Sequence, residues 1–248
     1  MKITRSIALP AVFVALLTGC GDGDEAADDS ITTTAAQTTA TTTTTTTISG
    51  AGVTTSTTGV PTLEQPAIWP APGVVFESPE DAAADFVSKV LRVPPQLGEF
   101  QQGDSRSGEI EVLPPAETAG SGPIRSVLLM RRLGPDNGWF VLAAVNDNTT
   151  ITSPESTARV SAGPVEVSGE GRGFEGLLIV EAYVAGDAGN RLDQQTTQGG
   201  SLAEPEPYSV TVDLSGAESG RTVLLLVRGG VGLDTDPGVF SAIPIIMD

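Results

Sequence analysis

Apolar residues recur with the period of a helix in one short part of the chain. Positions 83, 86, 87, 90 and 91 are apolar, which is the spacing of one face of a helix. Ser78 is a favoured N-cap residue, Pro79 suits the first helical turn, and Pro94 ends the pattern. The spacing therefore predicts one amphipathic helix from about residue 79 to residue 91.

Strand patterns follow this helix in the sequence. Residues 109–112 alternate between polar and apolar, and two β-rich runs, 124–133 and 139–145, flank the turn sequence GPDNG at 134–138. These patterns predict an α+β domain over residues 67–149, with one helix on a small antiparallel sheet. Within it, Trp139 and Phe140 are interpreted as core or rim aromatics, with ligand stacking as the alternative.

Only strand patterns occur from residue 150 to the end of the sequence. Apolar and polar residues alternate in 165–167, 177–184 and 208–212, whereas residues 223–227 are continuously apolar. Turn sequences rich in Gly, Asp and Pro separate these runs. Short strands at this spacing predict an all-β sandwich over residues 150–248.

A threonine-rich segment precedes both predicted domains. It contains an uninterrupted run of threonine from 41 to 47 and almost no large apolar residue. Such a segment cannot bury enough surface to offset the entropy lost on ordering. We therefore predict a disordered tether over residues 20–66, of the kind that often carries O-linked glycans outside the cell.

The first residues have the pattern of an export signal. Lys2 and Arg5 precede an apolar stretch from 7 to 17, which is too short to span a bilayer as a stable helix. The stretch ends in Leu-Thr-Gly-Cys at 17–20, which resembles the lipobox of bacterial lipoproteins. An ordinary secretory signal with a chance cysteine is the alternative.

The lipobox resemblance implies both a processing site and a location. It implies a signal peptide over residues 1–19, cleavage between Gly19 and Cys20, and a diacylglycerol on the Cys20 thiol. Two acyl chains such as palmitate hold a protein stably to a membrane. We therefore expect a lipid-anchored protein on the extracytoplasmic face of the cell membrane.

The predicted sandwich also carries a family resemblance. Ser153-Pro154, the run PVEVSG at 164–169, and Phe174-Glu175-Gly176 before a strand resemble the immunoglobulin-like domain of bacterial spore-germination and related secreted proteins. The resemblance implies an antiparallel immunoglobulin-like sandwich outside the membrane. It does not imply catalysis.

Composition removes most familiar catalytic chemistries. The formal net charge is −18, histidine is absent and there is one cysteine. The acidic charge disfavours nucleic acid as a partner. Without histidine there are no imidazole bases, and a single cysteine forms no Cys cluster within the chain. The sequence therefore assigns no catalytic, cofactor-binding or metal-binding residue, and we predict that the protein is not an enzyme.

Three weaker motifs have simpler structural interpretations. Residues 171–176 match G-x-G-x-x-G but precede a strand pattern, so we interpret them as a strand connection with Phe174 in the core. The segments 234–236 and 146–148 carry oxygen ligands that suit Ca²⁺, but they lack EF-hand spacing and are typical of turns. The third motif is a basic cluster that either receives an acidic partner or balances nearby acids: Arg125, Arg131 and Arg132.

These observations favour a non-catalytic binding or scaffold module at the bacterial envelope. The expected partners are the membrane, through the lipid anchor, and an envelope protein or cell-wall glycan. Two alternatives stay open. One is a metal-free carboxylate hydrolase of cell-wall polymers, and the other is a small-molecule or lipid carrier built on the α+β domain.

Overall fold

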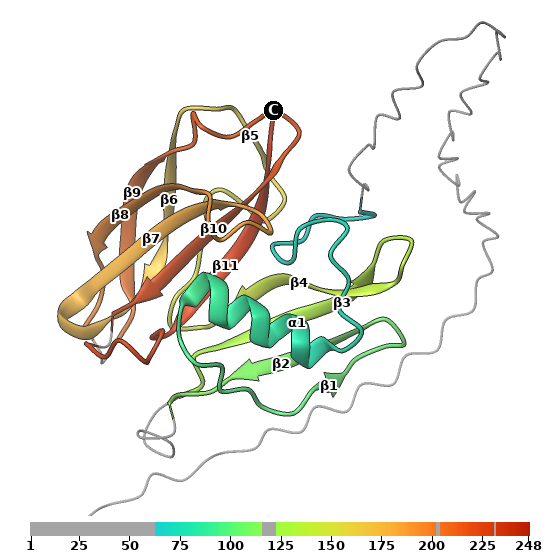
Figure 1. Ribbon diagram of the computed structural model, residues 1–248. Helices are drawn as coiled ribbons and strands as arrows, with labels where there is room; N and C mark the ends of the chain where they lie inside the picture. The colour runs from blue at the N-terminus through green and yellow to red at the C-terminus, as the bar shows by residue number, and fades with distance from the viewer. Residues whose placement is uncertain (1–62, 116–122, 202–203, 231) are drawn as a thin grey trace, which may run out of the picture. The chain divides into compact units, whose positions relative to one another are not determined.

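The computed structural model describes residues 63–115, 123–201, 204–230 and 232–248 (Figure 1). The chain divides into two units, Met1–Thr55 and Ser56–Asp248, and all described residues lie in the second. In these described residues, no helix combines the length and the apolar character needed to cross a membrane.

The predicted helix is confirmed. The α-helix α1 (Pro79–Phe86) follows Ser78, whose Oγ accepts a hydrogen bond from the Asp81 backbone N–H at 3.1 Å. The chain continues as one π-helical segment, η1 (Val87–Leu91). It leaves the helical path at Arg92, which has a φ of 60°.

Antiparallel strands form the rest of the structure. The main sheet has the order β1-β2-β3-β4-β11-β10-β7-β8, with β5 pairing in parallel with β11, and a second sheet consists of β6 and β9. The strands are β1 (Gln101–Gln102), β2 (Ser107–Val112), β3 (Ser126–Leu133), β4 (Gly138–Val145), β5 (Arg159–Val160), β6 (Pro164–Gly171), β7 (Leu177–Val184), β8 (Arg191–Gln198), β9 (Glu206–Asp213), β10 (Thr222–Gly229) and β11 (Phe240–Met247). One helix on antiparallel strands, followed by a mostly β sandwich, agrees with the predicted fold class.

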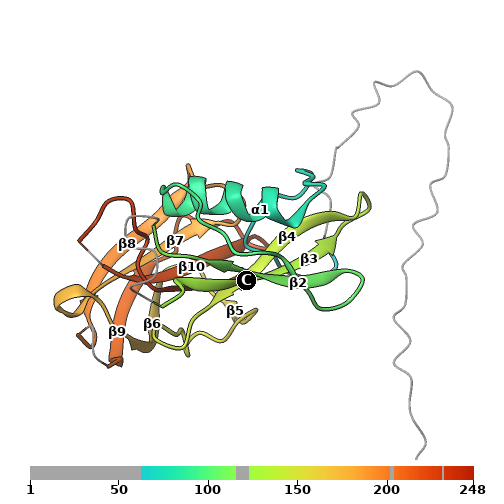
Figure 2. The same ribbon diagram turned by 90° about the horizontal axis from the view of Figure 1, so that it is seen from below.

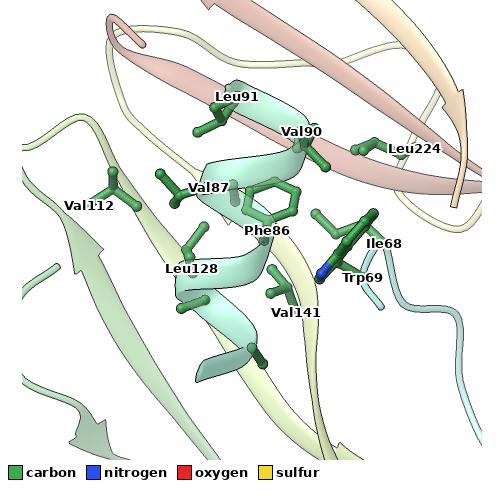
Figure 3. Packing of buried hydrophobic residues seen from close by; sticks show 14 of the residues in the cluster. Ile68, Trp69, Phe86, Val87, Val90, Leu91, Val112, Leu128, Val141 and Leu224 are labelled. Atoms are coloured by element: carbon green, nitrogen blue, oxygen red, sulfur yellow. The ribbon is translucent and has the colours of Figure 1, made fainter. Parts of the chain in front are cut away.

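One main core lies between the α1–η1 helix and the sheet. Figure 3 shows Val90 pointing toward Leu224 of β10, whereas Val87 points toward Val112 of β2 and Leu128 of β3. In Figure 2, α1 lies along one side of strands β2 to β4. A second core lies between β6 and β9 on one side and β7, β8, β10 and β11 on the other.

The two predicted domains share a sheet in this structure. Ala144 of β4 pairs with Ala242 of β11, which joins the small sheet to the sandwich. Strand β10 explains the join, because Leu224 and Leu226 face the helix while Val223 and Leu225 face the sandwich core. A strand buried on both faces needs a continuous apolar run rather than alternation. The domain boundary near residue 149 stays a prediction.

Strand β8 was not predicted, because the sequence patterns indicate no strand between residues 184 and 208. Strand β8 has the sequence RLDQQTTQ, and its positions 194, 196 and 198 are exposed. Leu192 is the single large apolar side chain it contributes to the sandwich core. The side chains of β8 bury little apolar surface. The strand forms because its backbone pairs with β7, from Leu177↔Gln198 to Tyr183↔Arg191.

Candidate functional site

Gly19 and Cys20 lie outside the described residues, as does nearly all of the predicted tether. Lipidation of Cys20 and cleavage after Gly19 therefore stay predictions.

Three loops meet where β7 begins and β10 ends. The Gly173 N–H donates to the Gly200 carbonyl at 3.0 Å, and the Phe174 N–H donates to the Gly230 carbonyl at 2.6 Å. In return, the Gly230 N–H donates to the Leu177 carbonyl at 3.1 Å. The loops are therefore joined directly, backbone to backbone.

Two glycines make this close approach feasible. A Cβ on Gly173 would lie 2.2 Å from the Leu177 carbonyl oxygen, and a Cβ on Gly229 would lie 2.0 Å from the Arg172 carbonyl oxygen. Real Cβ atoms do not approach other atoms so closely. The glycines are needed for contact between backbones, as in other sites where strands or loops approach closely.

The G-x-G-x-x-G segment connects two strands, as predicted. Strand β6 ends at Gly171, residues Phe174–Gly176 form one 3₁₀ turn (η3), and β7 begins at Leu177. A dinucleotide fingerprint needs a helix N-terminus after the glycines, because the helix amides hold the pyrophosphate. The strand that follows provides none.

The prediction that Phe174 lies in the core is wrong. Its side chain is 47% exposed, because the space inside the turn is filled by the backbone of the neighbouring loops. Leu177 and Leu233, from the same joined loops, are 38% and 50% exposed. We call these three side chains the apolar tip. Exposed acids flank it in the same loops: Glu175, Glu204 and Asp234.

The apolar tip gave only a weak signal in the sequence. Glycine pairs at 199–200 and 229–230 stand at the ends of β8 and β10, where they also suit ordinary turns. Only the structure shows that these pairs meet the 171–176 segment.

Part of each calcium candidate serves other contacts. Asp236 is 6% exposed and binds Arg125 in a two-point contact, with Nε to Oδ1 at 2.7 Å and Nη2 to Oδ2 at 2.5 Å. The Asn146 Oδ1 accepts the Asn148 backbone N–H at 2.8 Å, as in an ordinary Asx turn. Among the described residues, no three Asp, Glu, Cys or His side chains are grouped so that they could hold a metal ion.

The predicted basic cluster is dispersed. Arg125 serves the ion pair with Asp236, which joins the start of β3 to the loop before β11. Arg132 is paired in register with Trp139 and Arg131 with Phe140, so the two arginines face opposite sides of the sheet. The cluster therefore offers no single basic surface.

A second buried charge lies on the sandwich sheet. Glu181 is 2% exposed and accepts hydrogen bonds from Tyr183 at 2.8 Å, Arg191 at 3.2 Å and Arg228 at 3.1 Å. Burial, together with the neighbouring Glu181 carboxylate, raises the pKa of the Tyr183 hydroxyl. Because two arginines and a phenol satisfy the carboxylate, this group acts as a structural ion-pair network.

The fold and these contacts define a mostly β protein with an immunoglobulin-like sandwich and a site made of loops. Residues 148–228 match a family described as the immunoglobulin-like domain of bacterial spore germination. The match covers about a third of the chain and excludes β11, α1 and strands β1 to β4. Such a domain is consistent with a non-catalytic binding module. No curated protein and no solved structure matches the chain.

Proposed function

We propose that this protein is a lipid-anchored, non-catalytic binding module on the extracytoplasmic face of a bacterial membrane. In this proposal Cys20 carries the lipid, and the folded part binds an envelope protein through the apolar tip. A germination-type immunoglobulin-like domain is one support. The observation that carries the proposal is the apolar tip itself.

The tip has the features of a preorganised contact surface. Phe174, Leu177 and Leu233 are exposed on loops that backbone hydrogen bonds join. Grouped exposed apolar side chains mark interaction sites, and large aromatic side chains dominate the energy of many interfaces. Loops that hydrogen bonds already join lose less entropy on binding, which adds to affinity.

The rim identifies the kind of partner. Glu175, Glu204 and Asp234 are exposed in the same three loops as the apolar side chains. These acids would face anionic lipid headgroups unfavourably, and they would repel the same rim on a second copy of this acidic chain. An apolar pocket bordered by Lys or Arg on another protein complements the tip. Leu177 and Leu233 have no polar side-chain group for the hydroxyls of a glycan.

The two rival functions have less support. A glycosidase-type general acid needs a carboxyl with a raised pKa. Hydrogen bonds instead lower the pKa of four carboxyls among the described residues: Glu64, Asp104, Asp193 and Asp213. A carrier on the α+β part needs an apolar cavity beneath the helix. That space is filled by buried side chains, among them Ile68, Phe86 and Leu128.

The test uses a photo-crosslinking amino acid in cells of the native host. Placed at Leu177, it should form an adduct with one envelope protein. Placed at Thr196, which is also exposed but lies on polar β8, it should not. Phe174→Asp should abolish the adduct. The purified variant should bind the purified partner at least tenfold more weakly than the unchanged protein does. Added salt should weaken the binding of the unchanged protein.

Each arm has an outcome that contradicts the proposal. Equal adducts from Leu177 and Thr196, or an adduct with wall polysaccharide alone, would reject the protein-docking tip. Unchanged processing and detergent partitioning of a Cys20→Ala variant would reject the anchor. Clearing of wall polysaccharide in a zymogram by the mature chain would favour the hydrolase.

A further inference from the structure

Two buried N–H groups at the N-terminal end of α1 have no acceptor. Arg132 Nε and Trp139 Nε1 lack a hydrogen-bond partner among the described residues. The other tryptophan differs, because Trp69 Nε1 donates to Asp85 Oδ2 at 2.9 Å. Buried donors are nearly always paired, so two unpaired donors in one place call for an explanation.

Both residues belong to the wall of one cavity. It has a volume of about 270 Å³ and lies between the start of α1 and β1. The Arg132 guanidinium lies 5.0 Å from the centre of the Trp139 ring, and Phe100 meets that ring edge to face at 5.2 Å. Trp139, at 5% exposed, is fixed between them.

Carboxylates line the same cavity. Glu77, Glu80 and Asp104 belong to its wall, yet none of them lies within 4.0 Å of the Arg132 guanidinium among the described residues. The Asp104 Oδ1 accepts the Arg106 backbone N–H at 2.7 Å. That hydrogen bond lowers the pKa of Asp104, so its carboxylate stays ionised at neutral pH. The cavity therefore holds positive and negative groups that do not neutralise each other by contact.

We infer that this cavity binds a small zwitterion, with the ligand's carboxylate on the Arg132 side and its ammonium group on the side of Glu77, Glu80 and Asp104. Arginine is suited to carboxylate binding because its N–H groups match the two oxygens. A simple anion would meet three carboxylates, and a simple cation would meet Arg132. The volume is below that of a typical drug-sized pocket, so the ligand has the size of an amino acid or the end of a short peptide.

The test is a titration of the ¹⁵N-labelled mature chain followed by NMR. The protein has two tryptophans, so two indole N–H signals are expected, and a Trp139→Phe variant assigns them. The probes are glycine and diglycine, which separate an amino acid from a peptide as the ligand. Acetylglycine lacks the ammonium group, and glycinamide lacks the carboxylate.

Glycine or diglycine should shift the Trp139 signal in a saturable manner and leave the Trp69 signal in place. Acetylglycine and glycinamide should bind at least tenfold more weakly. Arg132→Gln should abolish the shift, whereas Arg221→Gln, which removes one positive charge at the start of β10, should not. Glu80→Gln removes one of the negative charges on the ammonium side, so it should weaken binding. Because the Glu80 side chain is exposed, the change should not affect folding.

Three results would overturn the inference. One is the absence of a saturable Trp139 shift with either zwitterion. Another is equal binding of acetylglycine, which would indicate a plain anion site. The last is unchanged binding in Glu80→Gln. The site is separate from the apolar tip, so these outcomes leave the proposed docking function untouched.

Discussion

The buried ion pair between Arg125 and Asp236 is expected to hold the two halves of the fold together. The two residues are 111 positions apart in the sequence. Their side chains are 9% and 1% exposed. Asp236 also accepts the Gly238 N–H at 2.9 Å, and the Arg125 carbonyl accepts the Phe240 N–H at 3.0 Å. Changing Arg125 to Met removes the positive charge while keeping most of the side-chain volume.

The expected loss of stability in Arg125→Met follows from the environment left around Asp236. Asp236 would stay buried with one backbone hydrogen bond and no counter-charge. Breaking one partner of a buried pair costs about 3–5 kcal/mol of the free energy of unfolding. For a folded part of this size, such a loss lowers the melting temperature by roughly 10 °C. The double variant Arg125→Met/Asp236→Leu removes both charges, so it should be more stable than Arg125→Met alone.

The assay is urea unfolding, followed by tryptophan fluorescence and far-UV circular dichroism. Arg159→Met is the matched control, because Arg159 pairs with Asp248 at 3.6 Å on the surface, where the side chains are 68% and 50% exposed. It should leave the unfolding midpoint nearly unchanged. Two results would refute the reasoning. One is an Arg125→Met midpoint equal to that of the control. The other is a double variant whose loss of stability equals the sum of the losses measured for Arg125→Met alone and Asp236→Leu alone.

Three further predictions concern packing, acid stability and the loops. Phe86→Ala empties a fully buried position and should cost about 3–5 kcal/mol in urea unfolding. Burial alone would raise the pKa of Asp193, but hydrogen bonds from Gln195 and the Asp213 N–H outweigh it and lower the pKa. This carboxylate therefore stabilises the fold above its unfolded pKa of about 3.9, and the contribution is lost as the pH falls through the folded value. Asp193→Asn should flatten the acid side of a plot of urea midpoint against pH, and an unchanged slope would contradict this. Gly173→Ala should lower the melting temperature, because the added methyl group meets a carbonyl oxygen, and an unchanged melting temperature would show that the loops can move apart.

Local patterns in the sequence were sufficient for the elements with local causes. The helix beginning at Pro79 was predictable because its cap and its apolar period lie within a few residues. The hairpin of β3 and β4 was predictable because its turn residues lie between two β-rich runs. The family resemblance was likewise carried by short motifs near the start of the sandwich.

Longer-range features could not be predicted in this way. The apolar run 223–227 indicated a buried strand but not that its two faces belong to two different cores. The polar strand β8 has no apolar period of its own. Phe174 looked like a core residue because an isolated aromatic beside a strand usually packs inward.

The sequence by itself determined the helix, the strands of the sandwich that carry apolar patterns, the acidic charge and the absence of histidine chemistry. Only the tertiary structure decided which loops meet to expose the apolar tip, which acid neutralises Arg125, and which walls surround Arg132 and Trp139. The physical reason is that a side-chain period is a property of neighbouring residues. Contacts between distant segments depend on which backbone edges pair and how closely they approach.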